Sequence, residues 1–187
     1  RHINEFKFDG KKENAFKGII NHLTLIYNGN ICLKNVIKLT VSSLLKATNR
    51  SIEAIVDLEN EETYMQFDQS IDKPKGRSFI IYDFGKYKIK IVQYSMRSRN
   101  SEPKENHMKN WNIEVSNDGQ DWKIIDEKRK ESSLCNYKAQ NTFTVKTKLE
   151  PNEFYRYVRF YQTGVDSEGE FYGCISALEF FGSIICD

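Results

Sequence analysis

The stretch from Trp111 to Ile125 constrains the fold more than any other part of the sequence. Apolar and polar residues alternate on both sides of Asn117-Asp118-Gly119, and such alternation is typical of half-buried strands. An Asn-Asp-Gly turn supplies the positive φ angles that a tight hairpin requires. The sequence therefore predicts two antiparallel strands over residues 111–126, joined at residues 117–119.

Short runs of the same kind recur along the chain, and only Ala15–Leu23 has apolar residues at helical spacing. Many short strands with almost no helix predict an all-β fold, an antiparallel β-sandwich. The chain has 187 residues, of which 39% are hydrophobic and 13% aromatic, so we expect one domain with a substantial core. The further strands are expected at residues 37–42, 79–84, 86–94, 142–146, 154–162 and 175–181.

The composition excludes several classes of protein. A formal net charge of +2 argues against a nucleic-acid binder, and no run reaches the roughly 18 apolar residues of a membrane span. The chain contains no phosphate-binding glycine loop, no Gly-x-Ser-x-Gly elbow and no His-Glu-x-x-His helix, so we expect no enzymatic activity. The four cysteines are widely spaced, which favours free thiols and a cytoplasmic location.

An ordered series of short motifs in the second half of the chain is similar to a known module. The motifs are Tyr94–Ser98, His107–Trp111, Val115–Gly119, Tyr155–Phe160 and Ile175–Gly182. This series resembles the coagulation factor V/VIII C-type domain, or discoidin domain, of the galactose-binding-like superfamily, in particular the intracellular branch found beside BTB domains. The resemblance covers about residues 6–184. It implies an eight-stranded jelly-roll sandwich with one short N-terminal helix, a single domain over residues 1–187 that belongs to a longer multidomain chain.

Some motif residues have structural interpretations. Trp111 and Trp122 flank the hairpin turn at strand positions, and we expect both to pack in the core. Arg159 lies on an otherwise apolar strand, and we expect it to form an ion pair rather than to hold a ligand. Two further residues, Leu44 and Leu45, could imitate the apolar spikes of membrane-binding relatives, but we expect them in the core and expect no membrane binding.

The resemblance also implies a possible structural calcium ion, although no cofactor is required. The matching positions, an acidic turn and a glutamate near the C-terminus, are Asp57, Asn60, Thr63 and Glu179. Their oxygen atoms are of the kind that calcium prefers. The alternative is a solvated acidic turn, with Glu179 hydrogen-bonded to the backbone.

In this fold, ligands are usually bound by loops at one end of the sandwich, here residues 44–53, 97–110 and 164–173. We expect Arg99 to be exposed to solvent in the middle loop. The candidate binding residues in these loops are Arg97, Arg99, Asn100, His107, Asp166, Glu168, Phe171 and Tyr172.

These observations predict a non-catalytic recognition module that binds a protein partner through these loops. Two alternatives remain open. One is a carbohydrate-binding, lectin-like module in an extracellular or cell-surface location, since exposed aromatic and polar residues also suit sugars. The other is a structural component of a large assembly. The fold by itself does not decide between them.

Overall fold

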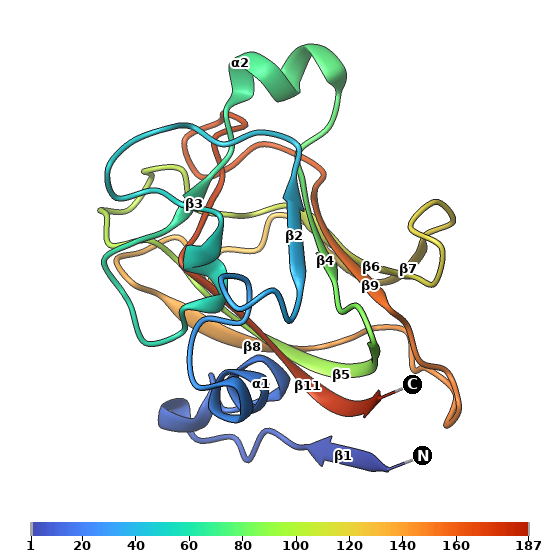
Figure 1. The fold of residues 1–187 in the computed structure, drawn as a ribbon. Helices are drawn as coiled ribbons and strands as arrows, with labels where there is room; N and C mark the ends of the chain where they lie inside the picture. Colours follow the sequence, from blue (N-terminus) through green and yellow to red (C-terminus); the bar gives the residue numbers. More distant parts are fainter. Residues whose placement is uncertain (1, 187) are drawn as a thin grey trace.

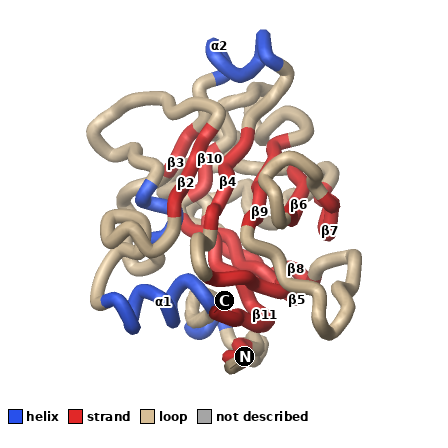
Figure 2. Tube along the Cα trace, turned by 45° about the vertical axis from the view of Figure 1, so that its right-hand side comes forward, coloured by secondary structure: helices blue, strands red, loops and turns tan. Residues whose placement is uncertain are grey.

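Two antiparallel sheets packed face to face form the body of the protein. The structure is a computed structural model that describes residues 2–186, and Figures 1 and 2 show its two layers. In the first sheet the strand order is β1 (Ile3–Phe6), β11 (Ala177–Cys186), β5 (Tyr87–Arg97) and β8 (Gln140–Thr144). In the second it is β2 (Lys38–Val41), β4 (Phe79–Asp83), β9 (Tyr157–Gln162), β6 (Trp111–Ser116) and β7 (Lys123–Lys128).

The predicted all-β jelly-roll sandwich is confirmed, with a few additions. The short strand β1 pairs with the end of β11, so the two sheets of the described residues contain one strand more than the expected eight. A small ladder joins β3 (Met65–Gln66) to β10 (Cys174–Ile175). A four-residue helix, α2 (Gln69–Asp72), follows β3, and 3-10 turns lie at Lys12–Asn14, Glu53–Val56 and Lys73–Lys75.

The core between the sheets explains the alternating sequence pattern. Inward-facing residues of both sheets form one continuous apolar cluster, in which Trp111, Phe160 and Phe180 are fully buried. The indole of Trp111 packs against Phe160, with ring centroids 6.0 Å apart. Aromatic residues of this size contribute a large share of the buried apolar area in a sandwich of this kind.

The helix α1 (Ile19–Tyr27) begins four residues later than the apolar spacing predicts. Its start is fixed by Gly18, where a Cβ atom would lie 2.3 Å from the backbone oxygen of Phe180. The side chain of Glu179 accepts hydrogen bonds from the first free N–H groups of the helix. A contact with the last strand, distant in sequence, therefore sets the first turn.

The predicted hairpin of β6 and β7 is present, and Gly119 has the expected positive φ of 72°. The prediction for Trp122 is wrong, because this residue precedes β7 and its ring is only half-buried on the outer side of the second sheet. There the guanidinium of Arg159 lies 4.2 Å from the ring centroid. Arg159 itself forms the expected ion pair, at 2.5 Å from Glu114.

The antiparallel register gathers four loops at one end of the sandwich. Val41 pairs with Ile80, Phe79 with Tyr161, and Arg97 with Ala177, so the segments after β2, before β4, after β5 and after β9 emerge together. Both views place α2 at this end and the two chain termini at the other (Figures 1 and 2). We call this the loop end.

Candidate functional site

The loops predicted to bind a ligand do converge at the loop end. The backbone N–H of Ser167 donates to the oxygen of His107 at 2.9 Å, and that of Cys174 donates to Asn106 at 3.0 Å. On the other side, the N–H of Leu45 donates to the oxygen of Gln66, which pairs with Cys174. Residues 44–53, 97–110 and 164–173 therefore form one connected surface.

Within this surface, His107 is a structural residue. It is fully buried, its Nε2 lies 2.8 Å from the backbone oxygen of Glu102, and its Nδ1 contacts the hydroxyl of Ser98. Burial lowers the pKa of the imidazole. A neutral ring that donates from Nε2 to the carbonyl and accepts at Nδ1 satisfies both contacts. The side chain ties together the ends of its own loop and is not available to a ligand.

The carboxylate of Asp166 is also used internally. It is buried, and one of its oxygens accepts hydrogen bonds from the backbone N–H groups of Glu168 and Glu170, at 2.9 and 3.0 Å. The other oxygen accepts from the amide of Asn106 at 3.0 Å. Asp166 therefore shapes the last loop, while Glu168 is exposed to solvent.

Arg97 is buried at the end of β5, where it holds a neighbouring turn. Its guanidinium donates to the backbone oxygens of Leu58 and Asn60 and to the hydroxyl of Ser176, at distances of 2.8 to 3.2 Å. Phe16 covers the guanidinium, with 5.1 Å between the ring centroid and Cζ. Because all three of its guanidinium nitrogens are hydrogen-bonded within the fold, Arg97 is a structural residue.

The residues proposed for calcium do not form a metal site. The two oxygens of Glu179 accept four backbone N–H groups, those of Gly18, Ile20, Asn21 and Phe180, at 2.7 to 3.0 Å. The amide oxygen of Asn60 accepts from Glu62 and Thr63, which closes a turn. No group of three His, Cys, Asp or Glu residues able to hold a metal occurs among residues 2–186. The positive charge beside the turn that contains Asp57 is supplied by Arg97.

The prediction that Arg99 is exposed is wrong. Its side chain is half-buried and its guanidinium lies 4.7 Å from the ring centroid of Tyr64, because the chain after β5 folds back over that residue. The neighbouring Asn100 donates to Glu62 at 2.9 Å. Tyr172 is half-buried, and its backbone oxygen accepts from the thiol of Cys174.

Of the residues predicted to bind a ligand, Phe171 lines a pocket at the loop end, which we call the Phe171 pocket. The pocket has a volume of about 360 Å³, within the usual range for small-ligand sites. It lies between α2 and the end of β9, and its walls come from three chain segments at the loop end. The lining residues are Asp72, Lys73, Gly76, Arg77, Ser78, Tyr161, Gln162, Thr163 and Phe171.

Three residues in the wall of this pocket carry buried polar atoms with no hydrogen-bond partner. These atoms are Oδ1 of Asp72, Oε1 of Gln162 and Oγ1 of Thr163. The other oxygen of Asp72 is held by the hydroxyls of Ser42 and Ser43, at 2.8 and 2.6 Å. An unsatisfied buried polar atom costs about 1–3 kcal/mol. These three atoms lie just beneath the pocket surface, so a ligand with hydroxyl groups would satisfy them if the side chains turned toward the pocket.

Sequence reasoning missed Asp72, Arg77, Gln162 and Thr163. Asp72 and Arg77 flank the turn between α2 and β4, a segment in which the sequence shows no recognisable motif. Gln162 is the last residue of β9. The run Gln69-Ser70-Ile71-Asp72, in a polar segment before a strand, could have indicated a loop but not the position of Asp72 beside Phe171. The antiparallel pairing of Phe79 with Tyr161 brings the segment before β4 to the end of β9, and the backbone N–H of Phe171 donates to the side chain of Gln69 at 3.1 Å.

An aromatic-lined pocket among loops carried by a rigid two-sheet sandwich is typical of ligand-binding sites. The model of the F5/8 type C domain family matches residues 38–179, about three quarters of the chain. The chain belongs to this family. A search of curated proteins finds no match.

Several solved structures with the same fold are carbohydrate-binding modules of family 32 (CBM32). The module CBM32-3 of a family 31 glycoside hydrolase from Clostridium perfringens has a TM-score of 0.61 at 19% identity, over 79% of this chain and 92% of that one. CpGH89CBM32-5 of the same organism, in complex with GalNAc-β-1,3-galactose, has a TM-score of 0.57 at 14% identity, over 79% and 96%. The family 32 module of its NanJ, in complex with galactose, has a TM-score of 0.55 at 12% identity, over 81% and 96%.

These comparisons support the predicted family and fold but not the predicted subtype, partner or location. The discoidin-type family and the galactose-binding-like fold are confirmed, whereas the BTB-associated subtype, the protein partner and the cytoplasmic location find no support. Among residues 2–186, no helix has the length and apolar character of a membrane span. The four cysteines are free thiols.

Proposed function

We propose that this chain is a non-catalytic carbohydrate-recognition module that binds a sugar in the Phe171 pocket. The observation that carries the proposal is the set of three unpartnered polar atoms, on Asp72, Gln162 and Thr163, around one pocket beside an aromatic ring. The membership in the F5/8 type C family and the sugar complexes of two structural neighbours support it.

The chemistry of the pocket suits a sugar in three respects. If the side chains of Asp72 and Gln162 turn toward the pocket, hydroxyl groups of a sugar would donate to their unpartnered oxygens. The guanidinium of Arg77 lies 5.8 Å from the ring centroid of Phe79, forms no ion pair within residues 2–186 and can donate in return. The ring of Phe171 offers an apolar surface to the C–H face of a sugar. An extracellular or cell-surface location, rather than the cytoplasm, suits such a ligand.

Isothermal titration calorimetry with galactose and N-acetylgalactosamine tests the proposal. We expect Phe171→Ala to weaken binding at least tenfold, which corresponds to about 1.4 kcal/mol. The matched control is Phe154→Ala, because Phe154 is also half-buried but precedes β9 at the opposite end of the sandwich. The control variant should bind as the unmodified chain does.

Two outcomes would overturn the proposal. One is equal affinity of the unmodified chain and Phe171→Ala for every sugar that binds. The other is a glycan array with no bound sugar together with a stoichiometric protein partner in a pull-down. That result would favour a protein-binding or assembly role.

A further inference from the structure

The arginines of the described chain fall into two groups. Arg129, Arg156 and Arg159 form ion pairs with carboxylates, and Arg97 is held by backbone oxygens. By contrast, Arg50, Arg77 and Arg99 form no ion pair within residues 2–186. All three lie at the loop end. Among the arginines of residues 2–186, those without an ion pair are therefore concentrated there.

Two of these arginines, Arg50 and Arg99, share one aromatic ring. Their guanidinium carbons lie 5.6 and 4.7 Å from the ring centroid of Tyr64, which is only 2% exposed. Both side chains are half-buried, and the Nε atom of each is buried with no hydrogen-bond partner. Stacking on a ring stabilises a guanidinium by about 1 kcal/mol, but it does not remove the repulsion between two like charges.

Few direct polar contacts hold the two guanidinium groups of this pair. The only hydrogen bond from either guanidinium within the described chain is a weak one, from Arg99 to the sulfur of Cys174 at 3.8 Å. Asp166 is also close enough to affect the Cys174 thiol, but its oxygens already accept three hydrogen bonds. The nearby Glu62 is bound to Lys138 and Asn100. Within residues 2–186, no carboxylate forms a direct ion pair with either arginine.

We infer that Arg50 and Arg99 bind an anionic substituent, a carboxylate or a sulfate, on the carbohydrate that occupies the loop end. The inference rests on the proposed carbohydrate binding and adds that the preferred sugars are acidic. A planar guanidinium presents paired donors that match the oxygens of a carboxylate or sulfate, and charge-assisted bonds of this type are the stronger ones. An anion between the two arginines would also relieve their mutual repulsion.

The test compares neutral and acidic oligosaccharides of equal length. The probes are a galacto-oligosaccharide, its 6-sulfated form and an oligogalacturonate, each titrated by calorimetry at low and at physiological salt. We expect the acidic probes to bind at least tenfold more tightly than the neutral one at low salt. The advantage should shrink as salt rises, because exposed charges are screened. The sulfated and carboxylated probes show which anion is preferred.

Two variants locate the effect. Arg50→Gln and Arg99→Gln should each reduce the preference for acidic probes at least fivefold and leave the affinity for the neutral probe unchanged. Arg156→Gln is the matched control, since it removes the same charge at the opposite end of the sandwich. Thermal melts of all variants show that each is folded.

The outcomes separate this inference from the proposed function. If no sugar binds, both fail. If the neutral probe binds and the acidic probes bind no more tightly, only the inference fails. If Arg99→Gln reduces the affinity for neutral and acidic probes equally, the inference is also overturned, because the arginine would then be structural. Binding of a polyglutamate peptide as tight as that of the acidic sugars would show general attraction of anions and overturn it as well.

Discussion

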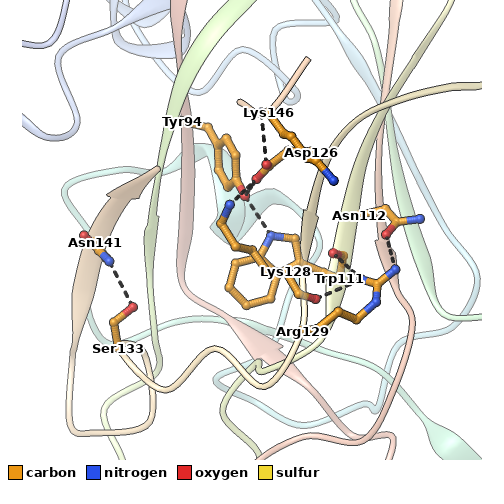
Figure 3. A network of polar contacts seen from close by, with 9 residues as sticks. All are labelled: Tyr94, Trp111, Asn112, Asp126, Lys128, Arg129, Ser133, Asn141 and Lys146. Atoms are coloured by element: carbon orange, nitrogen blue, oxygen red, sulfur yellow. Dashed lines mark hydrogen bonds and ion pairs between the residues drawn. The ribbon is translucent and has the colours of Figure 1, made fainter. Parts of the chain in front are cut away.

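The hydroxyl of Tyr94 donates a hydrogen bond of 2.5 Å to the carboxylate of Asp126, and this contact joins the two sheets through the core (Figure 3). Tyr94 lies on β5 and Asp126 on β7. The same hydroxyl accepts from the indole of Trp111 at 3.0 Å, and the carboxylate also binds the ammonium of Lys128 at 2.7 Å. Burial and the adjacent Asp126 charge raise the pKa of Tyr94, so the hydroxyl remains a donor at any working pH.

Tyr94→Phe should lower the free energy of unfolding by about 1–3 kcal/mol. The substitution keeps the ring but leaves the Trp111 N–H and one bond of the buried Asp126 carboxylate unsatisfied. Chemical denaturation measures the difference. The matched control is Tyr137→Phe, at a residue 55% exposed, which should change stability by less than about 0.5 kcal/mol. Equal stability of the two variants would contradict a role for the network.

The Glu179 carboxyl should make stability depend on pH in an unusual direction. Burial raises its pKa to about 7 in spite of the four backbone N–H groups that it accepts, while the ordinary value is 4.5. Between these two values the folded state binds more protons than the unfolded state. The contribution of Glu179 to the free energy of unfolding therefore falls as pH rises from about 4.5 to 7 and is constant above pH 7.

Glu179→Gln isolates this contribution, because other carboxylates titrate in both proteins. The free energy of unfolding of the unmodified chain minus that of the variant should decrease by about 3 kcal/mol across this pH range. Urea titrations at half-unit pH intervals provide the curve. A difference that stays flat, or increases with pH, would mean that the N–H groups outweigh burial.

The sequence predicts the strands well because each strand has its own alternating pattern. β2, β4, β6 and β9 all lie within the expected ranges, and the positive φ of Gly119 follows from local turn chemistry. The start of α1 could not be predicted, since it depends on Glu179, which is 159 residues distant from Ile20. Contacts of this range have no local signature.

The lack of a local signature for long-range contacts also explains why the candidate site was only partly predicted. The loops at 97–110 and 164–173 were recognised, but most of their polar residues hold the loops themselves. His107 and Asp166 look like ligand residues in sequence because loop-forming and ligand-binding side chains use the same polar groups. The pocket instead depends on Asp72 and Arg77, which the sheet register brings to Phe171.

Calcium should have no effect on stability. The guanidinium of Arg97 already binds the oxygens of Leu58 and Asn60, and Glu179 is used by α1. Thermal melts in calcium and in a chelator should therefore coincide. Arg97→Gln should lower the free energy of unfolding by about 2 kcal/mol or more, because the backbone oxygens of Leu58 and Asn60 lose their donor. Added calcium should not restore this lost stability. A higher Tm of the unmodified chain in calcium would show that a metal site exists after all.

Two glycines with positive φ should differ sharply in their tolerance of a side chain. Gly119 has open surroundings, since a Cβ atom there would lie no closer than 3.8 Å to the ring of Tyr157. Gly182 lies at a register shift of β11, and its Cβ would fall 1.9 Å from the backbone oxygen of Lys90. The first site therefore involves only backbone strain, and the second involves a clash with a central strand.

Gly119→Val should lower the free energy of unfolding by about 1 kcal/mol or more, because a β-branched residue is strained at positive φ. Gly119→Asn should be milder, since asparagine tolerates the left-handed region. Gly182→Ala should lower the free energy of unfolding by on the order of 3 kcal/mol or more, because β5 and β11 must separate to admit the methyl group. Denaturant titrations of the three variants rank the costs, and hydrogen exchange of the β5 and β11 amides reports the separation. Gly182→Ala as stable as Gly119→Asn would mean that the two strands can shift apart without loss, and unchanged stability in Gly119→Val would rule out a turn that requires positive φ.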